Sequence, residues 1–244
     1  MLDAPDASTP VRSSPVRHIA TLQEGPLHAA LKTWYAEPGD RHEVPVAGRQ
    51  IDLVRGDLLI EIQTGSFAAI RRKLTALVQT HRVRLVYPVP AETWIVRVDG
   101  RARVLGRRRS PRRGRLEQAF RELVSLPALL AHPAFSFEIL LTREDEVRRH
   151  SPGRAWHRKG WVVVERRLID VVSRHVFRRP DDLSVFLPPD LPPVFTTGDL
   201  ARGLGVDRDL AQKMAYCLRA AGVIAPTGKV RNAIGYRRRT PVDA

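Results

Sequence analysis

The chain has 244 residues, enough for one large domain or for a medium domain with a small one. It carries 41 Lys and Arg against 26 Asp and Glu, and the net charge of +15 favours a polyanionic partner. Cys217 is the single cysteine, which excludes an internal disulfide and a cysteine-based zinc site. No apolar run approaches the roughly 18 residues of a membrane span, and the N-terminus lacks a signal-peptide pattern, so we expect a soluble, cytoplasmic protein.

The first hundred residues predict an α/β domain after a disordered leader. Residues 1–17 are rich in Ala, Asp, Ser and Pro, a composition typical of disorder. Beyond them the apolar periodicity changes repeatedly between the helical and the strand type. It predicts a helix, three strands, a helix and a strand in that order, at 24–37, 43–47, 50–55, 58–63, 67–81 and 83–89.

The middle of the chain predicts more strands around an arginine-rich loop. Residues 107–115 hold six Arg, interrupted by Pro111 and Gly114, so a loop is expected there. The five prolines of 179–193 indicate a linker. Strands are expected at 93–98, 102–105, 135–141 and 161–165, with a helix at 116–130.

The last fifty residues predict a separate winged-helix domain. Thr196 and Thr197 can cap a helix that begins near Asp199, and Asp207 can cap a second helix at 208–221. Short strands at 223–225 and 233–237 complete the helix-turn-helix and hairpin order of a winged helix. The predicted organisation is therefore a core domain at 18–150, a connecting region at 151–193 and a winged helix at 194–244.

The segment from Gln50 to Gln63 carries the candidate chemistry. If Gly56-Asp57 is a two-residue hairpin turn of type II′, residue 55 pairs with 58 and Asp52 lies opposite Glu61. Their Cβ atoms would then be roughly 5 Å apart on one face, with Gln63 on the same face. Two carboxylates that close repel each other unless a cation lies between them. Mg²⁺, which prefers oxygen ligands, would relieve that repulsion and could activate water against a phosphodiester.

This order of elements, with an acid on the second strand and Glu-x-Gln on the third, resembles the PD-(D/E)XK nuclease superfamily across residues 24–98. The resemblance implies a restriction endonuclease-like core that hydrolyses DNA with Mg²⁺ or Mn²⁺. It implies that Asp52, Glu61 and the backbone carbonyl of Ile62 hold the metal. Glu24 stands where many members carry an additional acid. Many members act as dimers, so the resemblance also allows a homodimer.

Gln63 departs from the superfamily pattern, because Lys is usual at that position. Some restriction enzymes resemble this Glu-x-Gln form, but a Gln side chain cannot supply a positive charge and could only orient water by hydrogen bonds. Lys73, on the following helix, is a hypothetical alternative source of that charge. The catalytic set implied by the resemblance is therefore Asp52, Glu61 and Gln63, with Lys73 as an addition.

Basic residues in two regions are candidates for DNA contact. The arginine-rich loop would bind phosphates without regard to sequence. The second helix of the winged helix places polar residues away from its apolar stripe, and the wing adds two cations. The candidates are Arg107, Arg108, Arg109, Arg112, Arg113, Arg208, Gln212, Lys213, Tyr216, Arg219, Lys229 and Arg231.

These observations predict a metal-dependent DNA endonuclease that a winged helix positions on its substrate. One alternative is a non-catalytic DNA-binding protein or regulator with a decayed nuclease fold, which the Glu-x-Gln departure favours. A third is an RNA-binding protein, although seven Phe, four Tyr and four Trp provide few base-stacking platforms. No phosphate loop of the GxxxxGK[ST] type is present, so no nucleotide cofactor is expected.

Overall fold

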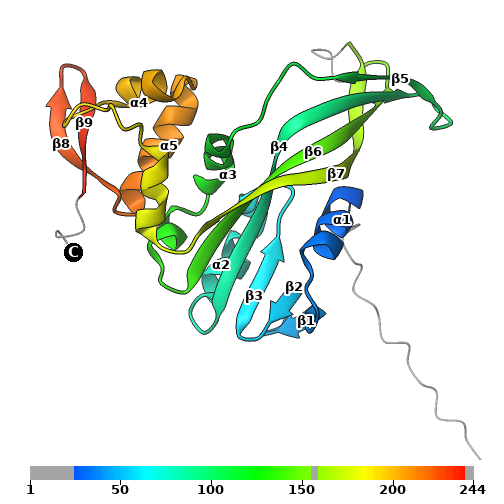
Figure 1. Cartoon of the computed structure of the whole chain (residues 1–244), viewed down its shortest axis with the longest axis horizontal. Coiled ribbons are helices and arrows are strands. Elements are labelled where there is room, and N and C mark those ends of the chain that lie inside the picture. Colours follow the sequence, from blue (N-terminus) through cyan, green and yellow to red (C-terminus); the bar gives the residue numbers. More distant parts are fainter. Residues whose placement is uncertain (1–24, 155–158, 240–244) are drawn as a thin grey trace, which may run out of the picture.

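The computed structural model describes residues 25–154 and 159–239 (Figure 1). Its main feature is a seven-stranded mixed sheet with helices on both faces, so the chain has a mixed α/β fold with a mainly sheet core. The leader expected at residues 1–17 lies outside the described residues. Within the described residues, no helix has the length and apolar character that crossing a membrane requires.

The sheet begins as an antiparallel meander. Helix α1 (Pro26–Tyr35) starts with Pro26 in its first turn, where the missing N–H costs no hydrogen bond. The next three strands are β1 (Arg41–Val46), β2 (Arg49–Arg55) and β3 (Leu58–Ile62), and β2 pairs antiparallel with both β1 and β3. The helix and three strands predicted for this region are all present, with bounds within about three residues.

The two crossover connections make the centre of the sheet parallel. After β3 the chain passes through η1 (Phe67–Ala69) and α2 (Arg71–Leu77) to β4 (Arg82–Val98), which is parallel to β3. Strand β6 (Phe135–His150) is parallel to β4, and β7 (Trp161–Phe177) is antiparallel to β6. The resulting order is β1-β2-β3-β4-β6-β7, and β5 (Val104–Arg109) pairs with the far half of β4.

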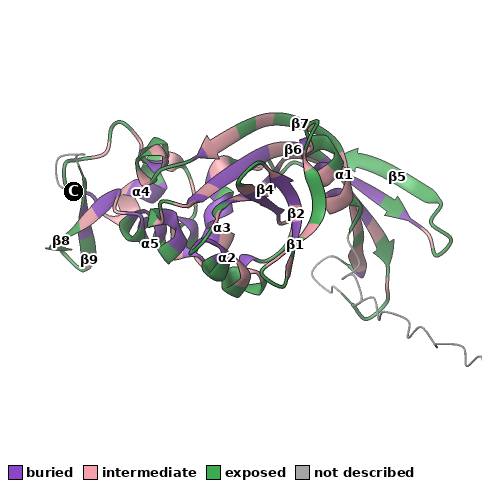
Figure 2. Ribbon diagram, turned by 90° about the horizontal axis from the view of Figure 1, so that it is seen from below, coloured by how far each residue is buried: buried purple, intermediate pink, exposed green. Residues whose placement is uncertain are grey.

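Both faces of this sheet are buried near β3. Leu53, Ile60 and Ile62 pack against α1 on one face. Val54 and Leu59 belong to the larger core that includes α2 on the other face. Figure 2 shows buried residues running along β4 and β6 toward the C-terminal helices, whereas β5 is exposed along its whole length. The end of β3 therefore lies between two helical layers, which shield it from solvent.

Two predictions for the middle of the chain are wrong. Residues 107–109 are part of β5, because pairing with β4 overrides the like-charge repulsion that favoured a loop. The helix expected at 116–130 is broken into η2 (Leu116–Ala119), α3 (Phe120–Leu123) and η3 (Pro127–Ala131), because Pro127 disfavours helical geometry in the residue before it. The connecting region expected at 151–193 contains the strand predicted at 161–165, but this strand, β7, is longer than expected and pairs with β6 in the sheet.

The C-terminal part consists of two helices and a hairpin. It follows η5 (Pro180–Phe186), and its elements are α4 (Thr197–Leu204), α5 (Arg208–Ala220), β8 (Ile224–Val230) and β9 (Ala233–Arg238). Thr196 caps α4 and Asp207 caps α5, as predicted. Gly205 ends α4 with a φ of +64°, a left-handed conformation that glycine adopts readily. The helices and strands expected here are present, although β8 is longer than expected.

Candidate functional site

The hairpin between β2 and β3 has the register that the sequence predicts. Arg55 pairs with Leu58 and Leu53 pairs with Ile60. Gly56 has a φ of +58°, whereas Asp57 has a negative φ, as a type II′ turn requires. Continuing this register by one residue places Asp52 opposite Glu61, in the space between the two helical layers.

At the end of β3, the Asp52 side chain accepts a hydrogen bond from a backbone N–H. Its Oδ2 accepts a hydrogen bond of 2.8 Å from the backbone N–H of Ile62. Its Oδ1 lies 3.2 Å from Nε2 of His28, on the first turns of α1. Burial alone would raise the pKa of Asp52, but His28 and the Ile62 N–H together lower it. Asp52 is therefore a carboxylate held in its charged form.

Glu61 is buried and has the opposite preference. Burial raises its pKa to about 7, and the negative charge of Asp52 acts in the same direction, while Lys73 opposes both. Glu61 Oε1 accepts a hydrogen bond of 2.5 Å from the Lys73 ammonium. Glu61 Oε2 is buried and has no hydrogen-bond partner among the described residues. An unpartnered buried carboxylate oxygen is costly, and it marks the place where a further positive group would be favourable.

Lys73, the hypothetical source of a positive charge, lies beside Glu61. It projects from α2 and contacts both Glu61 and the backbone carbonyl of Gln50. The side chain is largely buried, with 17% of its surface exposed. A cation from the following helix therefore stands beside the second acid, although the third strand carries no lysine.

Of the two remaining predicted site residues in this region, the structure describes Gln63 but not Glu24. Gln63 continues past β3, and its backbone N–H donates to the carbonyl of Val86 on β4. Its side-chain amide donates to the carbonyl of Ser66 at 2.9 Å, so part of its hydrogen-bonding capacity is used in the loop after β3. Glu24 lies outside the described residues.

His28 is the site residue that sequence reasoning missed. The eight histidines of the chain are scattered, and none has the spacing of a zinc site. The relevant signal was its place on the first turns of the predicted α1, one helical turn after Glu24, where an additional acid was expected. Only the packing of α1 against β2 and β3 brings the ring to Asp52.

The arginines of β5 and the loop after it fall into two groups. Arg107 forms an ion pair with Asp145 at 3.0 Å, and Arg109 forms one with Glu92 at 2.5 Å. Arg107 also lies over the ring of Trp94, 4.3 Å from its centroid. In the described part of the chain, the side chains of Arg108 and Arg112 have no acidic partner. The predicted arginine set is therefore divided between neutralised and free cations.

The predicted polar face of α5 is exposed. Arg208, Gln212, Tyr216 and Arg219 are exposed, while the opposite stripe is buried. Lys213 is half-buried and forms an ion pair with Asp209 at 2.7 Å. In the hairpin that follows, Lys229 on β8 and Arg231 in the turn are also exposed.

Comparison with known proteins identifies the family of this chain. Residues 25–178 match a family described as a domain of unknown function, DUF8091, and the chain belongs to that family. The match ends one residue after β7, so it covers α1 and the whole seven-stranded sheet. An uncharacterized protein from Treponema pallidum (strain Nichols) is 33% identical over 230 residues, which cover 92% of this chain and 89% of the relative. No solved structure matches the chain.

Proposed function

We propose that this protein is a divalent-metal-dependent DNA endonuclease with a PD-(D/E)XK-like core. The observation that carries the proposal is the pairing of an ionised Asp52 with a buried Glu61 whose Oε2 has no partner in the described residues. Lys73 beside Glu61 supplies a cation that such an active site uses. The order of α1, β1, β2, β3, α2 and β4 supports the same assignment, since the superfamily core has this order.

The residues present suit a magnesium ion better than a transition metal. Within residues 25–154 and 159–239 there is no group of three or more His, Cys, Asp and Glu that could enclose a metal. Mg²⁺ does not need such a cage, because it keeps several waters and binds through one or two carboxylates. Asp52, Glu61 and the Ile62 carbonyl would hold the ion. The unpartnered Glu61 Oε2 would then have a cation as its partner, which would offset the cost of burying this oxygen.

The side chains of the site would divide the work of phosphodiester hydrolysis. When bound, the metal supplies charge stabilisation for the phosphate and a water of lowered pKa. His28 positions Asp52 through its hydrogen bond. Lys73 is positioned to stabilise negative charge that develops on the phosphate, and its contact with the Gln50 carbonyl holds it there. Gln63 would orient water through its side-chain carbonyl.

The C-terminal part would act as a winged helix that anchors the enzyme on DNA. Its order of two helices and a hairpin is that of a winged helix. The exposed face of α5, with Arg208, Gln212 and Arg219, would contact DNA, and Lys229 and Arg231 would add contacts from the hairpin. The net charge of +15 supports a polyanionic partner of this kind.

Substitution of the two acids and of Lys73 tests this proposal. We expect Asp52→Asn, Glu61→Gln and Lys73→Met each to reduce Mg²⁺-dependent nicking of supercoiled DNA at least about 100-fold, as loss of a transition-state contact does. DNA affinity, measured by fluorescence anisotropy in EDTA, should stay within about twofold of the wild type.

Arg72→Met provides the matched control for Lys73→Met, because Arg72 is the preceding residue of α2 and is exposed. It should cleave like the wild type. Cleavage that survives in Lys73→Met would remove Lys73 from the mechanism. If the wild-type protein cleaves none of single-stranded, duplex, flapped and branched DNA with Mg²⁺ or Mn²⁺, this result would contradict the proposed endonuclease activity.

A non-catalytic DNA-binding protein is the alternative function, and the Lys73–Glu61 ion pair favours it. In such a protein the ammonium would replace the metal as the partner of Glu61. Thermal unfolding separates the two functions, because a ligand that binds only the folded state raises its stability. A magnesium-dependent rise in the melting temperature that Glu61→Gln abolishes would support the nuclease, and its absence would support the alternative.

A further inference from the structure

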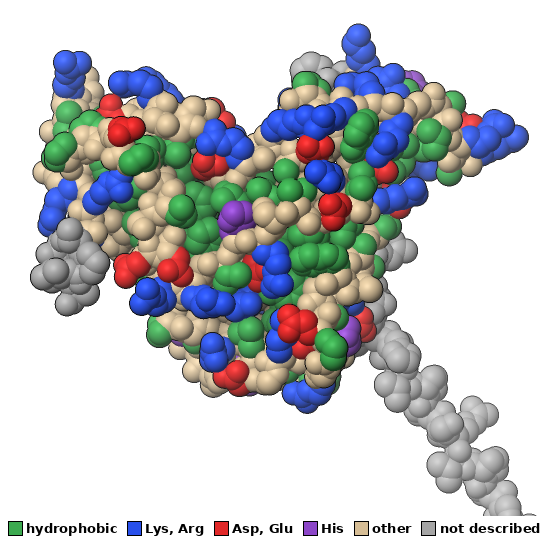
Figure 3. Space-filling view, viewed as in Figure 1, with side chains coloured by type: hydrophobic (Ala, Val, Ile, Leu, Met, Phe, Trp, Pro, Cys, Tyr) green, Lys and Arg blue, Asp and Glu red, His purple; other side chains and the backbone are tan. Residues whose placement is uncertain are grey.

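A large cleft lies between the sheet and the C-terminal helices, and Asp52, Glu61 and Lys73 are not among the residues that line it. Its volume is about 970 Å³, and its walls come from β4, β5, β6, α3 and the start of α5. Figure 3 shows a notch between the C-terminal helices and the upper part of the sheet, with Lys and Arg side chains along its side. Five arginines line the cleft, against two acids, Glu146 and Asp207.

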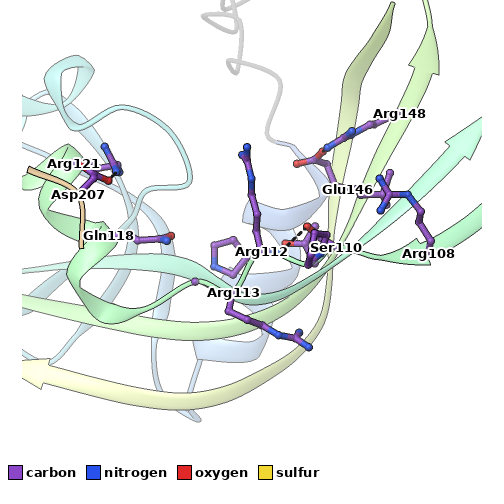
Figure 4. A pocket seen from close by; sticks show the side chains of 14 residues that line it. Arg108, Ser110, Arg112, Arg113, Gln118, Arg121, Glu146, Arg148 and Asp207 are labelled. Carbon is purple, nitrogen blue, oxygen red and sulfur yellow. Dashed lines mark hydrogen bonds and ion pairs between the residues drawn. The ribbon is translucent and has the colours of Figure 1, made fainter. Parts of the chain in front are cut away.

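Two of these arginines are free to bind an anion. Arg121 and Arg148 form ion pairs with Asp207 and Glu146, both at 2.5 Å. Arg108 and Arg112 have no acidic partner within the described residues. In Figure 4 Arg112 stands in the middle of the cleft, with Gln118 on one side and Ser110 and Glu146 on the other, while Arg113 points away.

The arginines on the two faces of β5 differ in whether an acid neutralises them. Arg107 and Arg109 share one face with Trp94 and are neutralised by Asp145 and Glu92. Arg108 projects from the opposite face into the cleft and has no such acid. Of these three consecutive arginines, only Arg108, which borders the cleft, therefore lacks an acidic partner among the described residues.

The size and lining of the cleft suit one strand rather than a duplex. A volume of about 970 Å³ is that of a large small-molecule site, which holds a few nucleotides. Pro90, Ile95 and Pro111 form an apolar part of its surface, against which unpaired bases and sugars can pack. None of the described residues that line it is aromatic, so recognition would depend on phosphates and would not depend on base identity.

Strand β4 connects the cleft to the acid pair. Val86 on β4 pairs with Ile62 at the end of β3, and Pro90 borders the cleft four residues later. At about 3.3 Å per residue, this places the border about 13 Å further along the strand. A nucleic-acid strand in the cleft would therefore lie two or three nucleotides from a phosphate held at Asp52 and Glu61.

We infer that the cleft binds the sugar–phosphate backbone of an unpaired DNA strand, with Arg108 and Arg112 as its phosphate contacts. The inference rests on the proposed function for the choice of DNA as the polyanion. It makes the substrate a DNA with a single-stranded segment next to the scissile phosphate.

Two double variants of β5 and its following loop test the inference. The probe is a fluorescein-labelled oligo(dT) of about twelve nucleotides, bound to the full chain in EDTA so that no cleavage occurs. We expect Arg108→Ala/Arg112→Ala to weaken binding about tenfold and to reduce the slope of log K against log salt by about 1.4, the value for two phosphate contacts on a single strand. The matched control, Arg107→Ala/Arg109→Ala, should keep the wild-type slope.

Three outcomes would overturn the inference. They are equal losses in the two double variants, an equal loss of affinity for a blunt duplex of the same length, and equal competition by oligo(U) at matched salt. Because binding is read in EDTA, loss of binding in Arg108→Ala/Arg112→Ala without any Mg²⁺-dependent cleavage by wild type would support the cleft and contradict the nuclease. If the wild type cleaves DNA with Mg²⁺ while Arg108→Ala/Arg112→Ala binds oligo(dT) as the wild type does, the result would support the nuclease and contradict the cleft.

Discussion

Asp52 and Glu61 interact electrostatically, but the pKa of Asp52 is lowered and the pKa of Glu61 is raised because their surroundings differ. Asp52 accepts hydrogen bonds from the Ile62 N–H and is paired with His28, which lower its pKa. For Glu61, burial and the Asp52 charge outweigh the opposing effects of Lys73 and His28, and its pKa is raised to about 7. A divalent cation held by both groups, as proposed above, would favour the ionised form of Glu61 as well.

The raised pKa of Glu61 predicts a loss of stability with rising pH. The unfolded chain releases this proton near pH 4.5, whereas the folded chain keeps it until about pH 7. The folded state therefore binds more protons between these values, and the free energy of unfolding must fall as pH rises through them. We expect urea unfolding of the wild type to show this fall and Glu61→Gln to reduce it.

The comparison with Glu61→Gln isolates this group, because the amide does not titrate. The Asp52 pKa is lowered, so its own contribution to pH dependence lies below this window. Parallel curves of stability against pH for the two proteins would show that Glu61 has an ordinary pKa.

At the scale of elements, β5 shows how pairing overrides local charge. The run of three arginines predicted a loop, yet each forms part of the strand that pairs with β4. Ion pairs with Asp145 and Glu92 and the Trp94 ring remove most of the repulsion. The predicted loop begins only at Ser110, and Gly114 brings it back against β4.

Gly114 is required because the loop passes very close to β4. Its N–H donates to the Pro90 carbonyl at 3.0 Å, and a Cβ at this position would lie 2.2 Å from that same oxygen. We expect Gly114→Ala to lower the free energy of unfolding by about 1–3 kcal/mol, measured by urea denaturation, because backbone must move. Gly106→Ala, whose Cβ would meet nothing within 4 Å, is the control and should not destabilise the protein. Equal effects would contradict this close approach.

At the scale of the whole molecule, the C-terminal helices share a core with the sheet. One continuous cluster of buried side chains runs from Phe67 through Phe120 to Met214 and Tyr236. Arg121 on α3 pairs with Asp207 and Asp209 at the start of α5. The two parts predicted from sequence as separate domains are therefore in extensive contact.

This shared core predicts cooperative unfolding of the two parts. Met214→Ala in α5 should lower stability by about 2–5 kcal/mol through the cavity it leaves. All four tryptophans precede residue 162, and Trp34, Trp94 and Trp161 lie on α1, β4 and β7, so none reports directly on the C-terminal helices. We expect the thermal midpoints from fluorescence and from far-UV circular dichroism to fall together. A fluorescence midpoint that stayed at the wild-type value would show that the C-terminal part unfolds independently.

Local patterns in the sequence were sufficient for the hairpin and the helix ends. The Gly56-Asp57 turn predicted the register that pairs Arg55 with Leu58 and Leu53 with Ile60, because turn type and loop length fix the register of a hairpin. Thr196 and Asp207 predicted the starts of α4 and α5, because a cap bonds to backbone within three residues of itself.

Only the tertiary structure brought His28 to Asp52 and Lys73 to Glu61, and only it divided the arginines into paired and free. Residues 24 and 12 positions apart meet in these contacts because α1 and α2 pack on opposite faces of one sheet. No periodicity along the chain encodes the angle at which a helix crosses a sheet. Whether a carboxylate is buried, and whether an arginine finds an acid, depends on that packing and is decided when the core forms.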